Sequence, residues 1–142
     1  MTNAEAWYNL SYTDVTELER VDEDLLRKVL ECPISTSSEM LYLELGVSPI
    51  RNIIRSRRLN FLQYILQEEK DSLMYKFLMT QMDNSVRNDW CLTFAQDNEI
   101  YKLGLKVEEI EPMSEATFKV LVKKKENEAT LEYLNNEKIA NK

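Results

Sequence analysis

Apolar residues recur every three or four positions along most of this chain, which is the spacing of one side of an α-helix. The clearest case lies between Ser11 and Cys32, where the apolar positions are Val15, Leu18, Val21, Leu25, Leu26, Val29 and Leu30. Ser11 or Thr13 can accept hydrogen bonds from the free N–H groups at the helix start. We therefore predict a first helix that ends before Cys32.

Two further helices are predicted from the residues that mark their ends. Thr36, followed three positions later by a glutamate, forms a capping-box pattern, and Gly46 suits the left-handed conformation that ends a helix. The pair Ser48-Pro49 then begins a third helix, because proline already has the backbone angle of the first helical turn. We expect this third helix to continue to about Gln67.

Helical spacing continues through the second half of the chain. We expect a fourth helix capped by Asp71, a fifth from about Asn88 that ends by Gly104, then a single turn, and a long last helix capped by Ser114. The polar residues 135–142 are expected to fray at its end.

Chain-breaking residues are scarce, since 142 residues include only two glycines and three prolines. A β-sandwich or barrel would need a turn signal every 8–12 residues. We therefore predict an all-α fold, a compact single-domain bundle of about six or seven helices without a sheet, over residues 1–142. Residues 1–10 are expected to be a lead-in segment cut from a larger protein.

The chain is acidic, with a formal net charge of −7 and a pI near 4.8. Such a surface repels phosphate groups, so only a local basic patch could contact a nucleic acid. The sequence has no apolar run long enough to span a membrane, and we expect an intracellular protein, cytoplasmic or nuclear, that does not act at a membrane.

Four arginines in the predicted third helix reverse this acidic character locally. When that helix is projected at 100° per residue, Arg57 falls in the middle of its apolar stripe, and Asp22 does the same in the first helix. Because an unpaired charge in an apolar contact is costly, we predict an ion pair of Arg57 with Asp22, or else with Glu44. The alternative is that these groups lie at the edge of the stripe and reach water through their aliphatic stems.

The other three arginines, Arg51, Arg55 and Arg58, project onto one ridge beside the apolar stripe. Guanidinium groups in such a row match the spacing of a phosphate backbone, and each can donate two parallel hydrogen bonds to a phosphate. The three residues are therefore a candidate nucleic-acid-binding site. The alternative is a solvated helix face paired with the many carboxylates of this chain.

Catalytic patterns are missing from the sequence. There is no histidine to serve as a general base, and two glycines cannot build a phosphate-binding loop. The acidic run 22–24 lacks the central glycine of a calcium loop. We expect a protein that is not an enzyme and that has no cofactor, metal site or small-molecule substrate.

Six blocks occur in a fixed order: WYNL at 7–10, LERVDEDLLRK at 18–28, EMLYLELG at 39–46, IRSRRLNFL at 54–62, NDW at 88–90 and MSEATFK at 113–119. Together they resemble the region that follows the polymerase core in LINE-type (non-LTR) retrotransposon reverse transcriptases. The resemblance covers nearly the whole chain. None of the six blocks is a catalytic motif.

This resemblance implies a thumb-like or post-thumb helical module that helps to hold an RNA or RNA–DNA template-primer. The chain has no adjacent pair of aspartates to act as the catalytic metal ligands of a polymerase palm, so the module would be an accessory part. The alternative is a protein-interaction or scaffolding module that docks on a polymerase core. Trp7 and Tyr8 are its candidate docking residues, and the arginine ridge would then meet an acidic partner.

Overall fold

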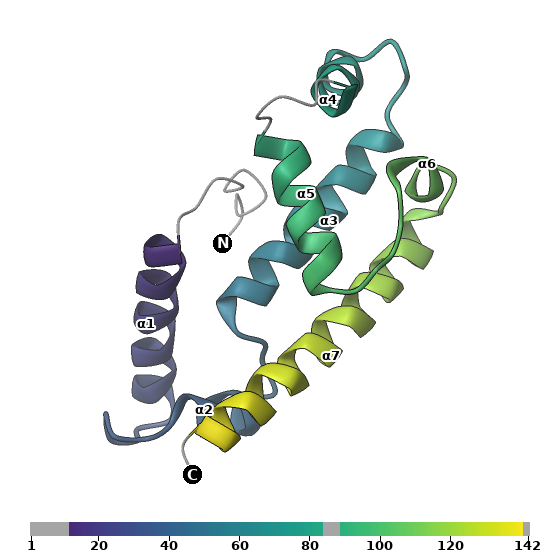
Figure 1. Ribbon diagram of the computed structural model, residues 1–142. Coiled ribbons are helices and arrows are strands. Elements are labelled where there is room, and N and C mark those ends of the chain that lie inside the picture. The colour runs from purple at the N-terminus through teal and green to yellow at the C-terminus, as the bar shows by residue number, and fades with distance from the viewer. Residues whose placement is uncertain (1–11, 84–88, 141–142) are drawn as a thin grey trace.

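The computed structural model describes the backbone of residues 12–83 and 89–140, and in these ranges the fold is all-α, as predicted, with no strand (Figure 1). The seven helices are α1 (Tyr12–Val29), α2 (Ser38–Leu45), α3 (Ile50–Leu66), α4 (Leu73–Asp83), α5 (Asp89–Ile100), α6 (Val107–Ile110) and α7 (Glu115–Ala140). The described part of the chain thus consists of helices joined by short connections.

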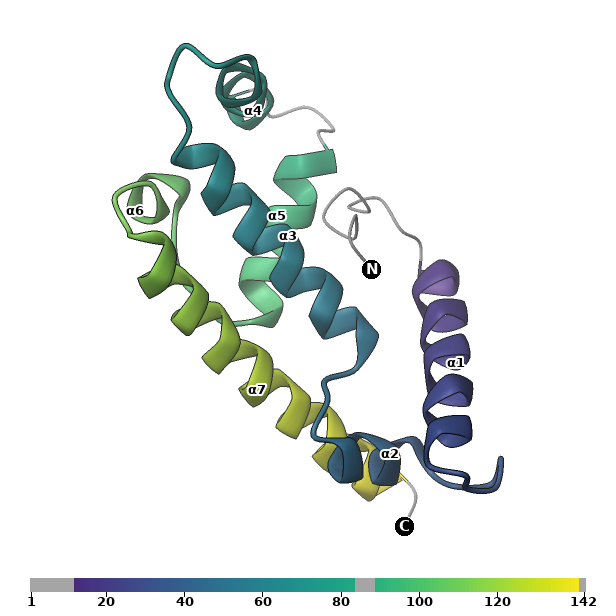
Figure 2. The same ribbon diagram turned by 180° about the vertical axis from the view of Figure 1, so that it is seen from behind.

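Helix α3 is the central element, since it contacts α1, α4, α5 and α7. The longest helix, α7, runs beside α3, and α1 stands at the edge of the molecule away from α6, as Figures 1 and 2 show from opposite sides. The short α2 connects α1 to α3 and also touches α7. Helix α1 therefore has few neighbouring helices, whereas α3 has neighbours on several sides.

Among the described residues, most of the buried apolar side chains fall into two separate clusters. The main cluster joins α3 to the second half of the chain and contains Leu59, Leu62, Ile65, Leu66, Leu78, Tyr101, Ile110, Phe118 and Val122. The second cluster consists of Ile50 and Ile54 with the half-buried Leu18 of α1. The contact of α1 with α3 therefore has a small apolar core of its own.

Several predicted helix ends are confirmed. Gly46 has a φ of 62°, in the left-handed region, and its N–H donates to the carbonyl of Tyr42 at the end of α2. Helix α3 begins directly after Pro49, and the Ser114 hydroxyl accepts a hydrogen bond from the N–H of Thr117 at the start of α7. These ends depend on local chemistry that the sequence alone displays.

Other ends differ from the prediction by a residue or more. Ser37, and not Thr36, caps α2, and the Ser72 hydroxyl rather than Asp71 accepts from the N–H of Tyr75 in α4. In each case a neighbouring serine takes the capping position that either residue type could fill. Helix α7 extends to residue 140, and the fraying expected for residues 135–142 stays a prediction.

Polar side chains are buried on α3 as well as apolar ones. Asn52 donates to the Thr130 hydroxyl, the Ser56 and Tyr101 hydroxyls lie 2.8 Å apart, and Gln63 donates to the carbonyl of Met113. Because these groups have partners, their burial costs little. The buried part of α3 is therefore wider than its apolar stripe.

No helix in the described ranges is both long and apolar enough to cross a membrane.

Candidate interaction site

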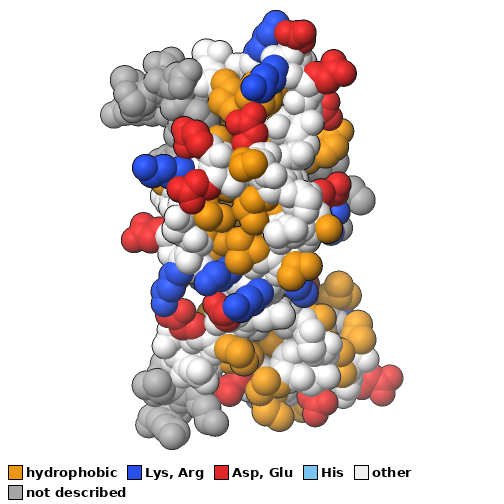
Figure 3. All heavy atoms as spheres, turned by 90° about the vertical axis from the view of Figure 1, so that its right-hand side faces the viewer, with side chains coloured by type: hydrophobic (Ala, Val, Ile, Leu, Met, Phe, Trp, Pro, Cys, Tyr) orange, Lys and Arg blue, Asp and Glu red, His pale blue; other side chains and the backbone are white. Residues whose placement is uncertain are grey.

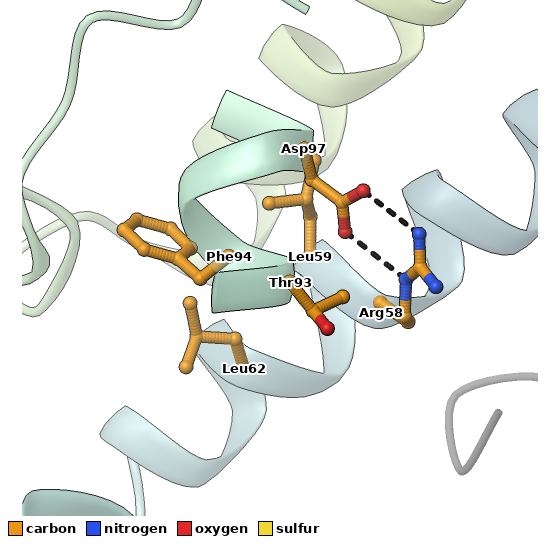
Figure 4. A pocket seen from close by; sticks show the side chains of 6 residues that line it. All are labelled: Arg58, Leu59, Leu62, Thr93, Phe94 and Asp97. Carbon is orange, nitrogen blue, oxygen red and sulfur yellow. Dashed lines mark hydrogen bonds and ion pairs between the residues drawn. The ribbon is translucent and has the colours of Figure 1, made fainter. Parts of the chain in front are cut away.

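Three of the four arginines of α3, Arg51, Arg55 and Arg58, ion-pair with buried carboxylates on neighbouring helices. Arg58 donates two hydrogen bonds to Asp97 of α5, from Nε to Oδ2 at 3.0 Å and from Nη2 to Oδ1 at 2.8 Å (Figure 4). The Asp97 side chain is only 3% exposed, and Nε of Arg55 lies 3.8 Å from its Oδ1. This pair fixes the position of α5 on α3.

Burial dominates the electrostatics of this pair. It raises the pKa of Asp97 to about 6, although both arginines act in the opposite direction. Burial also lowers the pKa of Arg55. The hollow beside the pair encloses about 10 Å³, which is the room of about one water molecule, so it offers no space for a ligand.

A second ion pair joins α3 to α1. Arg51 donates from Nε and Nη2 to the two carboxylate oxygens of Glu19, and the Nη2 bond is 2.7 Å long. Glu19 is buried, and the guanidinium carbon of Arg51 lies 5.8 Å from the ring centroid of Tyr133 on α7. Glu19 and Arg51 thus join α1 to α3 through a bidentate ion pair.

The three arginines of the predicted ridge thus lie on one side of α3, as expected, but in contacts between helices. Arg51, Arg55 and Arg58 are each partly buried and engage Glu19 or Asp97. We had expected any carboxylate partners to lie on a solvated face. A guanidinium that already makes two hydrogen bonds to a carboxylate has fewer donors left for a phosphate.

The predicted ion pair of Arg57 is wrong. The Arg57 side chain is exposed and forms no ion pair with Asp22 or Glu44, all three of which the structure describes. Glu44 is also exposed. Glu19 and Arg51 instead form the expected kind of contact, in which a buried carboxylate of the first helix pairs with an arginine of the third.

The error has a physical cause. Because α3 has neighbours on several sides, its buried arc is centred near Leu59, Leu62 and Leu66. The stripe that Arg57 shares with Tyr64 projects on the opposite side of the helix. Tyr64 is exposed as well. Sequence periodicity locates the apolar stripe, and here that stripe is not the middle of the buried surface.

Asp22 has a different environment from the one predicted. It is half-buried on α1 near Glu19 and Glu23, and burial, followed by these two negative charges, raises its pKa. Glu23 accepts a hydrogen bond of 2.9 Å from the Tyr42 hydroxyl. No ion pair of Asp22 occurs among the described residues.

Three apolar residues of α1 that contribute to its helical spacing are exposed. Val21, Leu25 and Val29 follow one another at intervals of four residues, and 62%, 58% and 64% of their surfaces are accessible. We call these three residues the α1 stripe. Helix α1 meets α3 through Leu18 and Glu19. Leu18 projects between Leu25 and Val29, so the stripe continues from this contact into later turns of α1, where its side chains stay exposed.

A larger hollow lies where α3, the end of α5 and α7 meet, with a volume of about 440 Å³. Its charged lining mixes Arg51, Arg55 and Lys102 with Glu99 and Glu132. Lys102 and Glu132 also form an ion pair of 3.8 Å. Charges of both signs make this hollow a poor match for a polyanion.

The face on the side of α7 carries apolar side chains too, in a central group with charged side chains around it (Figure 3). Val120 and Leu131 of α7 are 71% and 59% exposed. The α1 stripe is therefore not the only apolar surface in the described part of the molecule. Val120 and Leu131 serve below as controls for substitutions in the stripe, because they are similar in type and exposure.

Comparison with family models, curated proteins and solved structures finds no match for this chain. The likeness to a retrotransposon reverse transcriptase therefore stays a prediction. Within the described ranges, no group of three or more possible metal ligands comes together. The candidate docking residues Trp7 and Tyr8 lie outside the residues that the structure describes.

Proposed function

We propose that this chain is a non-catalytic protein-docking module that uses the exposed α1 stripe. The observation that carries this proposal is the α1 stripe. Three large aliphatic side chains at four-residue intervals remain exposed on a helix that the sequence pattern makes strongly amphipathic. Contiguous apolar surface of this kind marks interaction sites.

Exposed apolar side chains are also frequent in the segment that follows the stripe in sequence. Of the fifteen large hydrophobic residues exposed in the described ranges, eight lie between residues 21 and 47. Beyond the stripe they are Leu30, Ile34, Met40, Leu43 and Val47. This concentration favours the α1–α2 end of the molecule over the α7 face as the docking surface.

The alternative function, holding an RNA or RNA–DNA template-primer through the arginine ridge, has less support. Arg51 and Arg58 already make two hydrogen bonds each to a carboxylate, and the net charge of −7 opposes approach to phosphates. A docking role is also compatible with the expected likeness to a polymerase accessory region, in which the partner would be a polymerase core.

Position-specific photocrosslinking tests the docking proposal. A photoreactive amino acid replaces Val21 in one variant and Val120 in a control variant, and both are expressed as the full chain in cells. We expect a discrete protein adduct from position 21 that disappears when Leu25→Asp is added, and no such adduct from position 120. Absence of an adduct at position 21, or equal adducts at both positions, would contradict the proposal.

A further inference from the structure

The α1 stripe also indicates what kind of partner fits it, if the docking function proposed above is correct. Val21 to Val29 spans about 12 Å along the helix axis, or about two turns. A row of side chains at four-residue intervals forms a ridge that packs into the groove of another helix. The described ranges contain no strand, so no sheet edge is present there to bind an extended peptide.

The charges beside the stripe are predominantly negative. Asp14, Glu17 and Asp24 project within about 60° of Val21 on α1, and Lys28 is the cation in the same arc. Glu17 and Asp24 form ion pairs of 2.8 and 3.1 Å with Arg20 and Arg27, but both acids are more than half exposed. Such surface pairs are weak and exchange readily with another cation.

Asp22 borders the stripe on its other side, since it projects about 20° from Val29. It is half-buried beside two further carboxylates, Glu19 and Glu23, and has no ion pair with a described residue. Glu19 is engaged by Arg51 and Glu23 by the Tyr42 hydroxyl. Asp22 is therefore the carboxylate in this group whose negative charge a cation of a partner would stabilise most.

We propose that the α1 stripe and Asp22 bind a basic amphipathic helix of a partner protein. Its apolar side packs on Val21, Leu25 and Val29, and a lysine or arginine at the edge of that side pairs with Asp22. A second copy of α1 is excluded as the partner by like charge, and so is an anionic membrane surface. The charge pattern thus narrows the docking function to one chemical class of partner.

Synthetic helices of opposite charge test this proposal. Two peptides share one leucine pattern at helical spacing and differ only in their polar positions, which are lysine in one and glutamate in the other. Titration of each into the full chain is followed by calorimetry at low and at physiological salt. We expect the Leu/Lys peptide to bind and the Leu/Glu peptide to show no binding.

Matched variants locate the site. Val21→Gln/Leu25→Gln is compared with Val120→Gln/Leu131→Gln, which replaces the same residue types at comparably exposed positions of α7. The first pair should weaken binding of the Leu/Lys peptide by about tenfold or more, and the second by less than about twofold. Asp22→Asn should weaken binding by about threefold and reduce its dependence on salt. Since all the replaced apolar residues are exposed, circular dichroism should show the same melting behaviour in each variant.

The outcomes separate this inference from the docking function itself. Equal binding of both peptides, or equal losses in the two double variants, overturns the assignment of a basic helix to the α1 stripe. A crosslinked protein adduct at position 21 would then still support docking on α1. Absence of that adduct overturns the docking function, whichever peptide binds.

Discussion

At the scale of single residues, the type of a side chain predicts which kinds of contact it forms, but its position in the sequence does not predict which neighbour it contacts. The sequence predicts that acidic and basic side chains meet in contacts between helices, and the Glu19–Arg51 and Arg58–Asp97 pairs are of that kind. It does not show which arginine turns inward. Arg57 and Arg58 are neighbours, yet only Arg58 faces a buried carboxylate, because α5 packs on its side of α3.

The different environments of Arg57 and Arg58 should produce different losses of stability on substitution by alanine. Arg58→Ala should lower the free energy of unfolding by about 2–4 kcal/mol, because Asp97 stays buried and keeps only its longer contact with Arg55. Arg57→Ala should change it by less than about 0.5 kcal/mol, since the side chain is exposed. Urea unfolding of both variants checks this. Similar losses in the two variants would contradict the assigned ion pair.

Asp97 should also give stability a specific pH dependence. Its pKa in the folded chain is raised from 3.8 to about 6, so the folded state holds the proton more tightly than the unfolded state. The stabilising contribution is complete below about pH 4 and is lost as the pH rises through about 6. The advantage of the wild-type chain over Asp97→Asn in free energy of unfolding should therefore shrink by about 2–3 kcal/mol between pH 4 and pH 7.

Denaturant unfolding of both chains at several pH values measures that difference. Carboxylates other than Asp97 are common to the two chains, so their titration largely cancels in the comparison. A difference that stays constant, or that grows with pH, would show that the two arginines outweigh burial at this site.

At the scale of elements, helix positions are easier to predict than the sides that helices bury. Gly46, Pro49 and Ser114 mark ends by backbone chemistry that involves only near neighbours in sequence. The buried side of α3 depends on its packing against four other helices, and the exposure of the α1 stripe depends on how α1 packs against α3. No periodicity within one helix contains that information.

Helix α7 offers a direct test of its assigned buried side. Phe118 is completely buried in the main cluster, whereas Val120, two residues later, is 71% exposed. Phe118→Ala should cost about 3–5 kcal/mol of unfolding free energy, and Val120→Ala less than about 0.5 kcal/mol. Thermal and urea unfolding of both variants distinguish them. Comparable losses would mean that α7 is rotated about its axis relative to this arrangement.

At the scale of the whole molecule, net charge favours the proposed docking function over nucleic-acid binding. Three free arginines on phosphates would give a log–log salt dependence of binding with a slope of about −2 to −3. Because Arg51 and Arg58 are engaged by carboxylates and the chain is acidic, we expect no measurable binding to a short RNA–DNA hybrid even at low salt. Fluorescence anisotropy at two salt concentrations checks this. Binding with the slope above would restore the template-primer function.

The division of the core into two clusters has a consequence for cooperativity. Leu18, Ile50 and Ile54 lie apart from the main cluster, so α1 can detach by local unfolding while the contacts between α3 and α7 persist. A ligand that binds only the attached form of α1 would shift this local equilibrium by mass action. Occupancy of the α1 stripe would then slow amide exchange in α1 and leave the slowest-exchanging amides of α3 and α7 unchanged.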